Sequence, residues 1–451
     1  MLPAMLSPVA LVAQNDSTMK FSLKEAQDYA IRNFYVSKNA KLDIEKAKKV
    51  VLETTAMGLP QVKASASWAY IPGTIPTIDF GSSIAEGLGS VFGDLIANGY
   101  LNRDSLPQAG APTPIAEKST ITYGFTVSQL ILNGEYIVGL RASKVYKSLY
   151  ERINDKTEIG LKESVAEGYF SILILERNRK LLSEMLENLK SIKDQSEAYY
   201  KAGFMESTDV DQINLMVLST ETSLKTVERQ IELLNKLFAY QLGMTDPVKI
   251  ELTDSLDDLI ASNIVDDTSY SFSLEDNVDY QMLDTQEKLM KLNLNRERAK
   301  YMPTVAGFYQ YQDKNNKPVF DFTMKHLIGV SIEVPIIGSG SRIATTSQAR
   351  IEYEKAQNTK DQEISRITME AEQAVFNYRS ALEKYQNEKL ASDLAKKIYE
   401  KTNEKYKQGV TSSLDLTTVN NQYLQAQMTY AAAIQELLDA KVKLDKAYNK
   451  L

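Results

Sequence analysis

The pattern of hydrophobic and polar positions changes its period several times along the chain. From Leu23 to about Met57 apolar residues recur with a helical period, and Ser22 with Glu25 forms the sequence signature of a capping box at its start. A strictly alternating pattern follows at 62–72 and returns at 119–132, where apolar or aromatic residues alternate with small or polar ones. This alternation predicts two strands with unlike faces.

Two much longer helical patterns come next. The segments from Glu135 to about Ala202 and from Ser341 to about Gln408 contain no proline, and roughly 68 residues at 1.5 Å each predict helices about 100 Å long. A shorter helical segment follows each of them. Apolar residues at steps of three and four, such as Leu182, Met185, Leu189 and Ile192, indicate coiled-coil packing. We therefore predict helical hairpins at 135–243 and 341–451.

The two hairpins carry the same motif. "YYKAGFMESTDVDQIN" (199–214) and "KYKQGVTSSLDLTTVN" (405–420) share Tyr, Gly, Ser, Asp and Asn at a constant offset of 206 positions. The motif falls at the turn of each hairpin, where Gly203 and Gly409 are expected to end the outgoing helix. Thr208 with Asp209, and Ser413 to Asp415, are expected to cap the returning helix.

Further matched landmarks make the chain a tandem duplication. The first repeat covers 20–244. The second covers 272–451, with strands at 304–312 and 326–335, and a polar linker at 245–271 joins the two. One loop, 73–118, is much longer than its counterpart and contains nothing catalytic. It is expected outside the cell, as a cover, a contact site or flexible decoration.

Four strands of about ten residues with unlike faces suit either a lipid-spanning barrel or a soluble sheet with one buried face. Four strands cannot close a barrel, and hydrocarbon does not tolerate an open sheet edge. If the strands cross a membrane, several chains must share one barrel. Residues 1–13 are apolar and read as the remnant of an export signal ending near Ala13, or else as a frayed tail.

Composition excludes several classes of function. The formal charge is −7, and charged residues make up 25% of the 451 positions without a basic stripe, which disfavours a nucleic-acid partner. The chain has no cysteine and one histidine, His326, which we expect to be exposed at an interface and not a ligand. We therefore expect no catalytic site, no metal site and no cofactor. No apolar run is long enough for a transmembrane helix.

Four sequence features together resemble the TolC-like outer-membrane efflux family. They are "SLKEAQDYAIRN", the pair "LPQV" and "MPTV" before strands, "VPIIGSGSR" before the second long helix, and the doubled tip motif. The resemblance implies an α+β membrane protein, a homotrimer whose four strands per chain close a 12-stranded outer-membrane barrel in contact with lipid. Its long helices then form an α-barrel in the periplasm, and its partners are a periplasmic adaptor (membrane fusion) protein and an inner-membrane RND or ABC-type transporter.

The resemblance also assigns roles to the tips. It implies a periplasmic constriction at Thr208, Asp209, Tyr406 and Asp415, and adaptor docking at Gly203 and Gly409. Thr411 stands where family members carry an arginine, and Thr418 where they carry a second gate aspartate, so a salt-bridge latch is not expected. Helix capping explains the presence of Asp209 and Asp415 in one interpretation, and a cation-favouring ring of three copies of Asp415 stays open as the alternative.

The function expected from these features is that of a passive exit duct in a tripartite efflux or type I secretion-like system. A soluble periplasmic coiled-coil adaptor or tether is the alternative, although it leaves the aromatic strands unexplained. An enzyme is disfavoured because the sequence has one histidine and no cysteine, and its acidic residues are scattered along helix faces instead of forming a catalytic cluster. The sequence does not identify the cargo or the pump.

Overall fold

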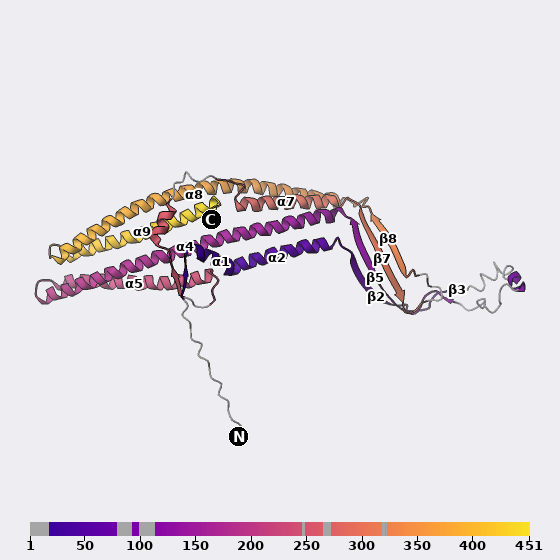
Figure 1. Ribbon diagram of the computed structural model, residues 1–451, viewed down its shortest axis with the longest axis horizontal. Coiled ribbons are helices and arrows are strands. Elements are labelled where there is room, and N and C mark those ends of the chain that lie inside the picture. The colour runs from indigo at the N-terminus through magenta and orange to yellow at the C-terminus, as the bar shows by residue number, and fades with distance from the viewer. Residues whose placement is uncertain are drawn as a thin grey trace, which may run out of the picture. The chain divides into compact units, whose positions relative to one another are not determined.

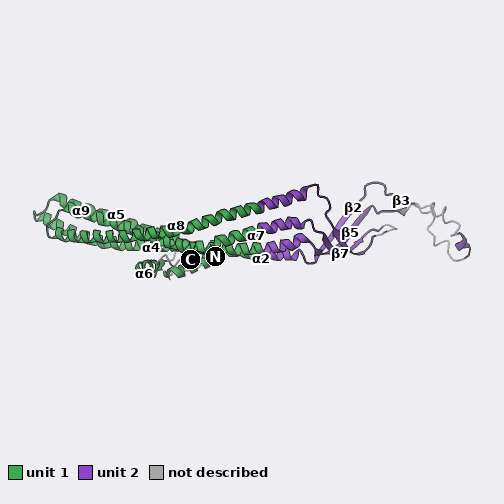
Figure 2. Ribbon diagram, turned by 90° about the horizontal axis from the view of Figure 1, so that it is seen from above, with its two compact units in different colours: residues 1–48, 145–289, 353–451 green, residues 49–144, 290–352 purple. Residues whose placement is uncertain are grey.

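The computed structural model describes residues 18–78, 93–98, 113–245, 249–264, 272–317, 321 and 323–451. The expected signal segment 1–13 and most of the loop 73–118 lie outside these residues. The chain divides into two compact units (Figure 2). Unit 1 comprises 1–48, 145–289 and 353–451, and unit 2 comprises 49–144 and 290–352. Among the described residues, no helix combines the length and the apolar character that crossing a membrane requires.

Two helical hairpins dominate unit 1 (Figure 1). Helix α4 (Gly134–Lys201) returns as α5 (Ser207–Gln241), and α8 (Ser341–Lys407) returns as α9 (Ser413–Ala447). The apolar residues that step by three and four along these helices supply two buried clusters, one centred on fully buried residues such as Val165, Ile434 and Leu437 and the other on Leu189, Ile213 and Leu416. The mostly helical character expected from the sequence is confirmed.

The expected helix from Leu23 to about Met57 is in fact two helices, α1 (Leu23–Asn33) and α2 (Tyr35–Ala56). The capping box of Ser22 and Glu25 is present at the start of α1. Phe34 interrupts the helix with an extended backbone, and its ring packs edge-on against Tyr240 at 5.6 Å. No proline or glycine marks this break, so periodicity alone could not place it.

The linker between the repeats contributes a strand and a short helix to unit 1. Strand β6 (Lys249–Leu252) pairs in parallel with β1 (Thr18–Phe21), and α6 (Leu256–Asn263) follows it. The hydroxyl of the fully buried Tyr169 lies 3.0 Å from the Phe21 carbonyl and 3.1 Å from Asp254 Oδ2, and it accepts the Asp254 N–H at 3.2 Å. Burial raises the pKa of Tyr169, so this hydroxyl keeps its proton and can donate.

We expect Tyr169→Phe to lower the free energy of unfolding of unit 1 by about 1–3 kcal/mol, because the Asp254 N–H and carboxylate lose a buried partner. Circular dichroism at 222 nm during thermal unfolding in detergent measures this loss. Tyr150→Phe, which removes one half-buried bond to Tyr146, is the control and should shift the transition much less. Equal shifts for both variants would show that the Tyr169 hydroxyl has no special role.

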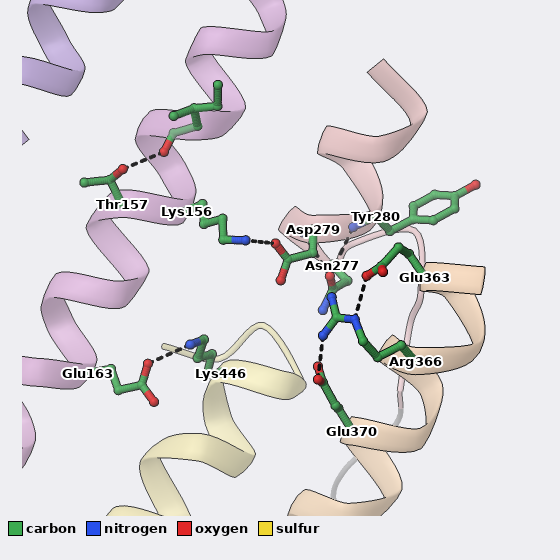
Figure 3. A network of polar contacts seen from close by, with 11 residues as sticks. Lys156, Thr157, Glu163, Asn277, Asp279, Tyr280, Glu363, Arg366, Glu370 and Lys446 are labelled. Atoms are coloured by element: carbon green, nitrogen blue, oxygen red, sulfur yellow. Dashed lines mark hydrogen bonds and ion pairs between the residues drawn. The ribbon is translucent and has the colours of Figure 1, made fainter. Parts of the chain in front are cut away.

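Ion pairs also join the helices of unit 1 (Figure 3). Lys156 of α4 lies 2.6 Å from Asp279, at the start of α7 (Val278–Ala299), and Lys446 of α9 lies 2.7 Å from Glu163 of α4. Asn277 caps α7, because its side-chain oxygen accepts hydrogen bonds from the backbone N–H groups of Asp279 and Tyr280. The start of α7 and the end of α9 are thus both fixed to α4.

Unit 2 contains one four-stranded antiparallel sheet. Its order is β2 (Gln61–Tyr70), β5 (Ser119–Leu132), β7 (Thr304–Lys314) and β8 (His326–Glu333). Strands β2 and β8 lie at the edges, each with one partner among the described residues. A separate short pair, β3 (Thr77–Ile78) with β4 (Thr113–Pro114), belongs to the described part of the long loop.

The register of the sheet gathers side chains of one kind on each face. Ala64 lies opposite Phe125, Phe125 opposite Tyr311, and Tyr311 opposite His326, and directly paired residues point to the same face. One face therefore carries Val62, Trp68, Ile121, Tyr123, Phe125, Val127, Tyr309, Tyr311, Ile328, Val330 and Ile332. The other carries mainly Lys63, Ser65, Ser67, Thr120, Thr122, Thr126, Ser128, Gln310, Gln312, Ser331 and Glu333. The predicted alternation is confirmed for most positions of the sheet. The exceptions are Asp313, which lies opposite Tyr123 on the apolar face, and Phe308 and Leu327, which lie on the polar face.

Candidate functional site

The two hairpin tips of unit 1 are built alike. The chain turns at Gly203 with φ of +82° and at Gly409 with φ of +73°, in the left-handed region that favours glycine. After each glycine a backbone N–H returns to the helix, from Phe204 to the Tyr199 carbonyl and from Val410 to the Lys405 carbonyl, both at 2.9 Å. These bonds close Schellman turns. Both glycines end their helices, as the sequence predicted.

Asp415 belongs to a capping box at the start of α9. Its N–H donates to Ser412 Oγ at 3.1 Å, and its carboxylate accepts from Ser412 Oγ at 2.7 Å and from Thr411 Oγ1 at 3.0 Å. The N-cap is therefore Ser412, one residue earlier than expected. The hydrogen bonds from Ser412, and then that from Thr411, lower the pKa of Asp415, so an exposed negative charge is held at this tip.

Three side chains join the start of α5 to the start of α9. Ser413 Oγ donates to Asp209 Oδ1, and Gln212 Oε1 lies 2.6 Å from the same hydroxyl. Ser413 is only 2% exposed, so the contact is shielded from water. We call Asp209, Gln212 and Ser413 the tip latch.

A second contact joins the two outgoing helices close to the latch. The Tyr406 hydroxyl of α8 lies 3.1 Å from Ser196 Oγ of α4 and 4.0 Å from the sulfur of Met205. Burial raises the pKa of Tyr406, which keeps the phenol neutral. Ser196 is itself buried. The first hairpin is therefore held to the second at both of its helices.

An aromatic and apolar core supports these contacts. Tyr399 and Tyr423 stack with ring centroids 5.4 Å apart, and Asn188 Nδ2 donates to the Tyr399 hydroxyl at 3.0 Å. Fully buried Ile213 and Leu416 belong to the same cluster. Because packed side chains resist displacement, the tip latch has a rigid foundation.

The structure brings together some of the expected tip residues and leaves others apart. Asp209 and Tyr406 both take part in contacts between the hairpins. Thr208 bonds only Glu206, at 3.4 Å, and Asp415 bonds only its own cap among the described residues. Ser413, Gln212 and Ser196 were not predicted from the sequence as partners in these contacts. Ser413 had a usable signal, because it is one of the residues that the two tip motifs share.

Sequence comparison finds a family match for the second repeat. Residues 271–450 match the sequence model of the family described as Outer membrane efflux protein. No curated protein matches the chain.

Solved structures match the whole chain. The Campylobacter jejuni CmeC outer membrane channel is 16% identical, covers 100% of this chain and 93% of its own, and gives a TM-score of 0.71. The open state of the Neisseria gonorrhoeae MtrE outer membrane channel is 15% identical over 99% of this chain and 97% of its own, with a TM-score of 0.69. The outer membrane protein VceC from Vibrio cholerae is 14% identical over 94% and 95%, with a TM-score of 0.68.

These solved structures establish the fold, and the family match places the second repeat in a family of outer-membrane proteins that serve efflux. The second repeat is therefore similar in sequence to the outer membrane efflux proteins, and the chain as a whole has the fold of the solved outer-membrane channels.

Proposed function

We propose that three copies of this chain form the passive exit duct of a tripartite efflux or type I secretion-like system. The observation that carries the proposal is the sheet of unit 2, which is apolar and aromatic on one face and small or polar on the other. In a soluble sheet the apolar face is covered, yet Trp68, Ile328 and Ile332 are 69%, 80% and 67% exposed. Lipid on that face and water on the other satisfy both sets of side chains.

The edges of the sheet support the trimer. Strands β2 and β8 each have one side without a strand partner among the described residues, and unpaired N–H and C=O groups are not tolerated in hydrocarbon. Pairing β8 of one copy with β2 of the next satisfies both edges in a closed ring. Three copies give twelve strands, a number within the range of outer-membrane barrels.

Exposed apolar residues on the helices of unit 1 also support assembly. On α5, Leu215, Leu218, Leu233 and Leu237 are at least half exposed, and on α8 so are Met369, Phe376, Leu390 and Leu394. Large apolar stripes of this kind mark interaction surfaces. Because the two stripes lie on different hairpins, they suit a head-to-tail interface, which generates a ring.

The tips supply the gate in this proposal. Solute enters between the hairpin tips, passes a constriction near Asp209, Tyr406 and Asp415, and leaves through the shared barrel. Transport through the duct is passive in this proposal, and the inner-membrane partner supplies the driving force. A periplasmic adaptor docking at the turns of Gly203 and Gly409, and an RND or ABC-type transporter in the inner membrane, complete the system.

Conductance across a planar lipid bilayer tests the duct. The purified full-length protein should insert and produce discrete single-channel steps. A preparation that retains its helices and its oligomeric state but never conducts would contradict the duct and favour the tether.

We expect Asp415→Ala to reduce the preference of the channel for cations, because a ring of carboxylates at a narrow point favours cations. Asp415→Asn is the matched variant, since it removes the charge and keeps an acceptor for the cap of α9. Reversal potentials in a KCl gradient should show the same loss in both variants. An unchanged preference in both would reduce Asp415 to a capping residue.

The pH dependence of this preference follows from the cap. Hydrogen bonds to the carboxylate hold its pKa below the ordinary value of 3.8, so the charge and its contribution to folding are present above that value and are lost as pH falls through the lowered pKa. Cation preference at pH 5 should therefore equal that at pH 7. A loss of preference between pH 7 and pH 5 would point to another titrating group.

A further inference from the structure

A groove of about 610 Å³ lies in unit 1 between α4, α5 and α9. None of its eighteen lining residues is charged, although a quarter of the residues in the whole chain are. Ten of the lining side chains are apolar, including Leu181, Val227, Leu424 and Met428, and the other eight are neutral and polar. Volume and lining both match the general character of sites for small organic molecules.

Most of the polar side chains of the groove already have partners. The hydroxyls of Thr222, Ser223 and Thr226 donate to carbonyls of their own helix. The amides of Gln427 and Gln435 donate to Ser392 and Asp439. Among the described residues, the side-chain amides of Asn178 on α4 and Gln230 on α5 make no hydrogen bond. Two neutral donor and acceptor groups are thus left to a ligand.

The internal repeat shows what the same positions do elsewhere. With the offset of 206 positions, Asn178 corresponds to Lys384 and Gln230 to Glu436. Lys384 and Glu436 form an ion pair at 2.6 Å between α8 and α9. Ion pairs also join helices elsewhere in unit 1 (Figure 3). The first repeat has a pair of free amides where the second repeat has a paired cation and anion.

We propose that this groove binds one uncharged, amphipathic organic molecule of drug size. Its apolar body lies on Leu181, Val227 and Met428, and its polar group exchanges hydrogen bonds with Asn178 and Gln230. A charged molecule is disfavoured because it would lose hydration without gaining a counter-charge. The site goes beyond the proposed duct, since binding can be measured whether or not the protein conducts.

Photolabelling of the full-length protein in detergent tests the site. The probes are N-butyl-4-benzoylbenzamide, which is neutral, its trimethylammonioethyl analogue, which is cationic, and 4-benzoylbenzoate, which is anionic. We expect the neutral probe to label the peptide containing Met428 about tenfold more than either charged probe, equivalent to about 1.4 kcal/mol. Equal labelling of that peptide by all three probes would overturn the proposal.

Matched variants separate the groove from general uptake of probe by detergent. The double variant Asn178→Lys with Gln230→Glu installs the ion pair of the second repeat and should reduce neutral labelling about tenfold. The reciprocal variant, Lys384→Asn with Glu436→Gln, leaves the groove intact and should label like the parent. Unchanged labelling in the first variant would refute the site.

A third variant covers the case in which the installed ion pair disturbs folding. Ala432→Trp fills the groove from an exposed position on its wall without changing the amides. With helicity retained by circular dichroism, it should also reduce labelling by the neutral probe. Labelling at the parent level would show that the probe binds elsewhere.

Discussion

Gly124→Ala is expected to abolish assembly of the shared barrel. A methyl group at this central position of β5 would stand 2.1 Å from the Tyr311 carbonyl oxygen and 2.9 Å from the Cα of Gln312, both on the adjacent strand β7. Backbone cannot move aside as a side chain can, so the two strands must separate. The cost is about 1–3 kcal/mol or more per copy, repeated in every copy of the ring. Size-exclusion chromatography with light scattering, in detergent, should show loss of the oligomer.

Gly307→Ala is the matched control in the same sheet. There an added methyl group meets only Ile131 Cδ1, at 3.5 Å, which is an ordinary contact. This variant should assemble like the parent. If Gly124→Ala also assembles normally, the register of β5 and β7 is not the one described here.

Ser413→Ala is expected to open the channel. The hydroxyl of Ser413 holds the first hairpin to the second through Asp209, and a hydrogen bond to a charged group contributes about 1.5–3 kcal/mol. Loss of this bond in each copy leaves the carboxylate without its partner and weakens the hold of the first hairpin tip on the second. Single-channel recording should show that the ratio of open to closed time rises by roughly tenfold or more for each latch lost. A larger conductance of the open state would also count as opening.

Ser412→Ala is the control for this experiment. It removes the neighbouring hydroxyl, which caps α9 but makes no contact with the first hairpin among the described residues. Its conductance should stay close to that of the parent. Identical behaviour of the two serine variants would assign any opening to a frayed α9 and not to the tip latch.

The sequence predicted the parts of the fold that repeat with a regular period. The alternation from Val62 to Tyr70 and the long proline-free helices were visible because each has a simple spacing. The duplication showed that the second repeat contains a pair of strands matching that of the first. The break at Phe34 was not predicted, because no proline or glycine marks it in the sequence. Its ring packs against Tyr240, some two hundred residues away, a contact that no local pattern indicates.

The candidate site was predicted in its location but only partly in its contacts. The doubled motif located both tips, and the glycines were read correctly because a left-handed turn requires them. The pairing of Ser413 with Asp209 was missed, since it joins two hairpins whose relative register no local pattern encodes. A cap at the start of α9 was predicted at Ser413 to Asp415, and the structure places its first residue at Ser412, one position earlier.

Several copies of the chain are proposed to share one membrane barrel, and the mass of the native assembly distinguishes this arrangement from a single soluble chain. We would extract the full-length protein from the outer-membrane fraction in detergent and measure its protein mass by light scattering. We expect a trimer in that fraction, with three times the chain mass of 50.6 kDa. A soluble monomer would contradict it and would make the four strands an ordinary sheet.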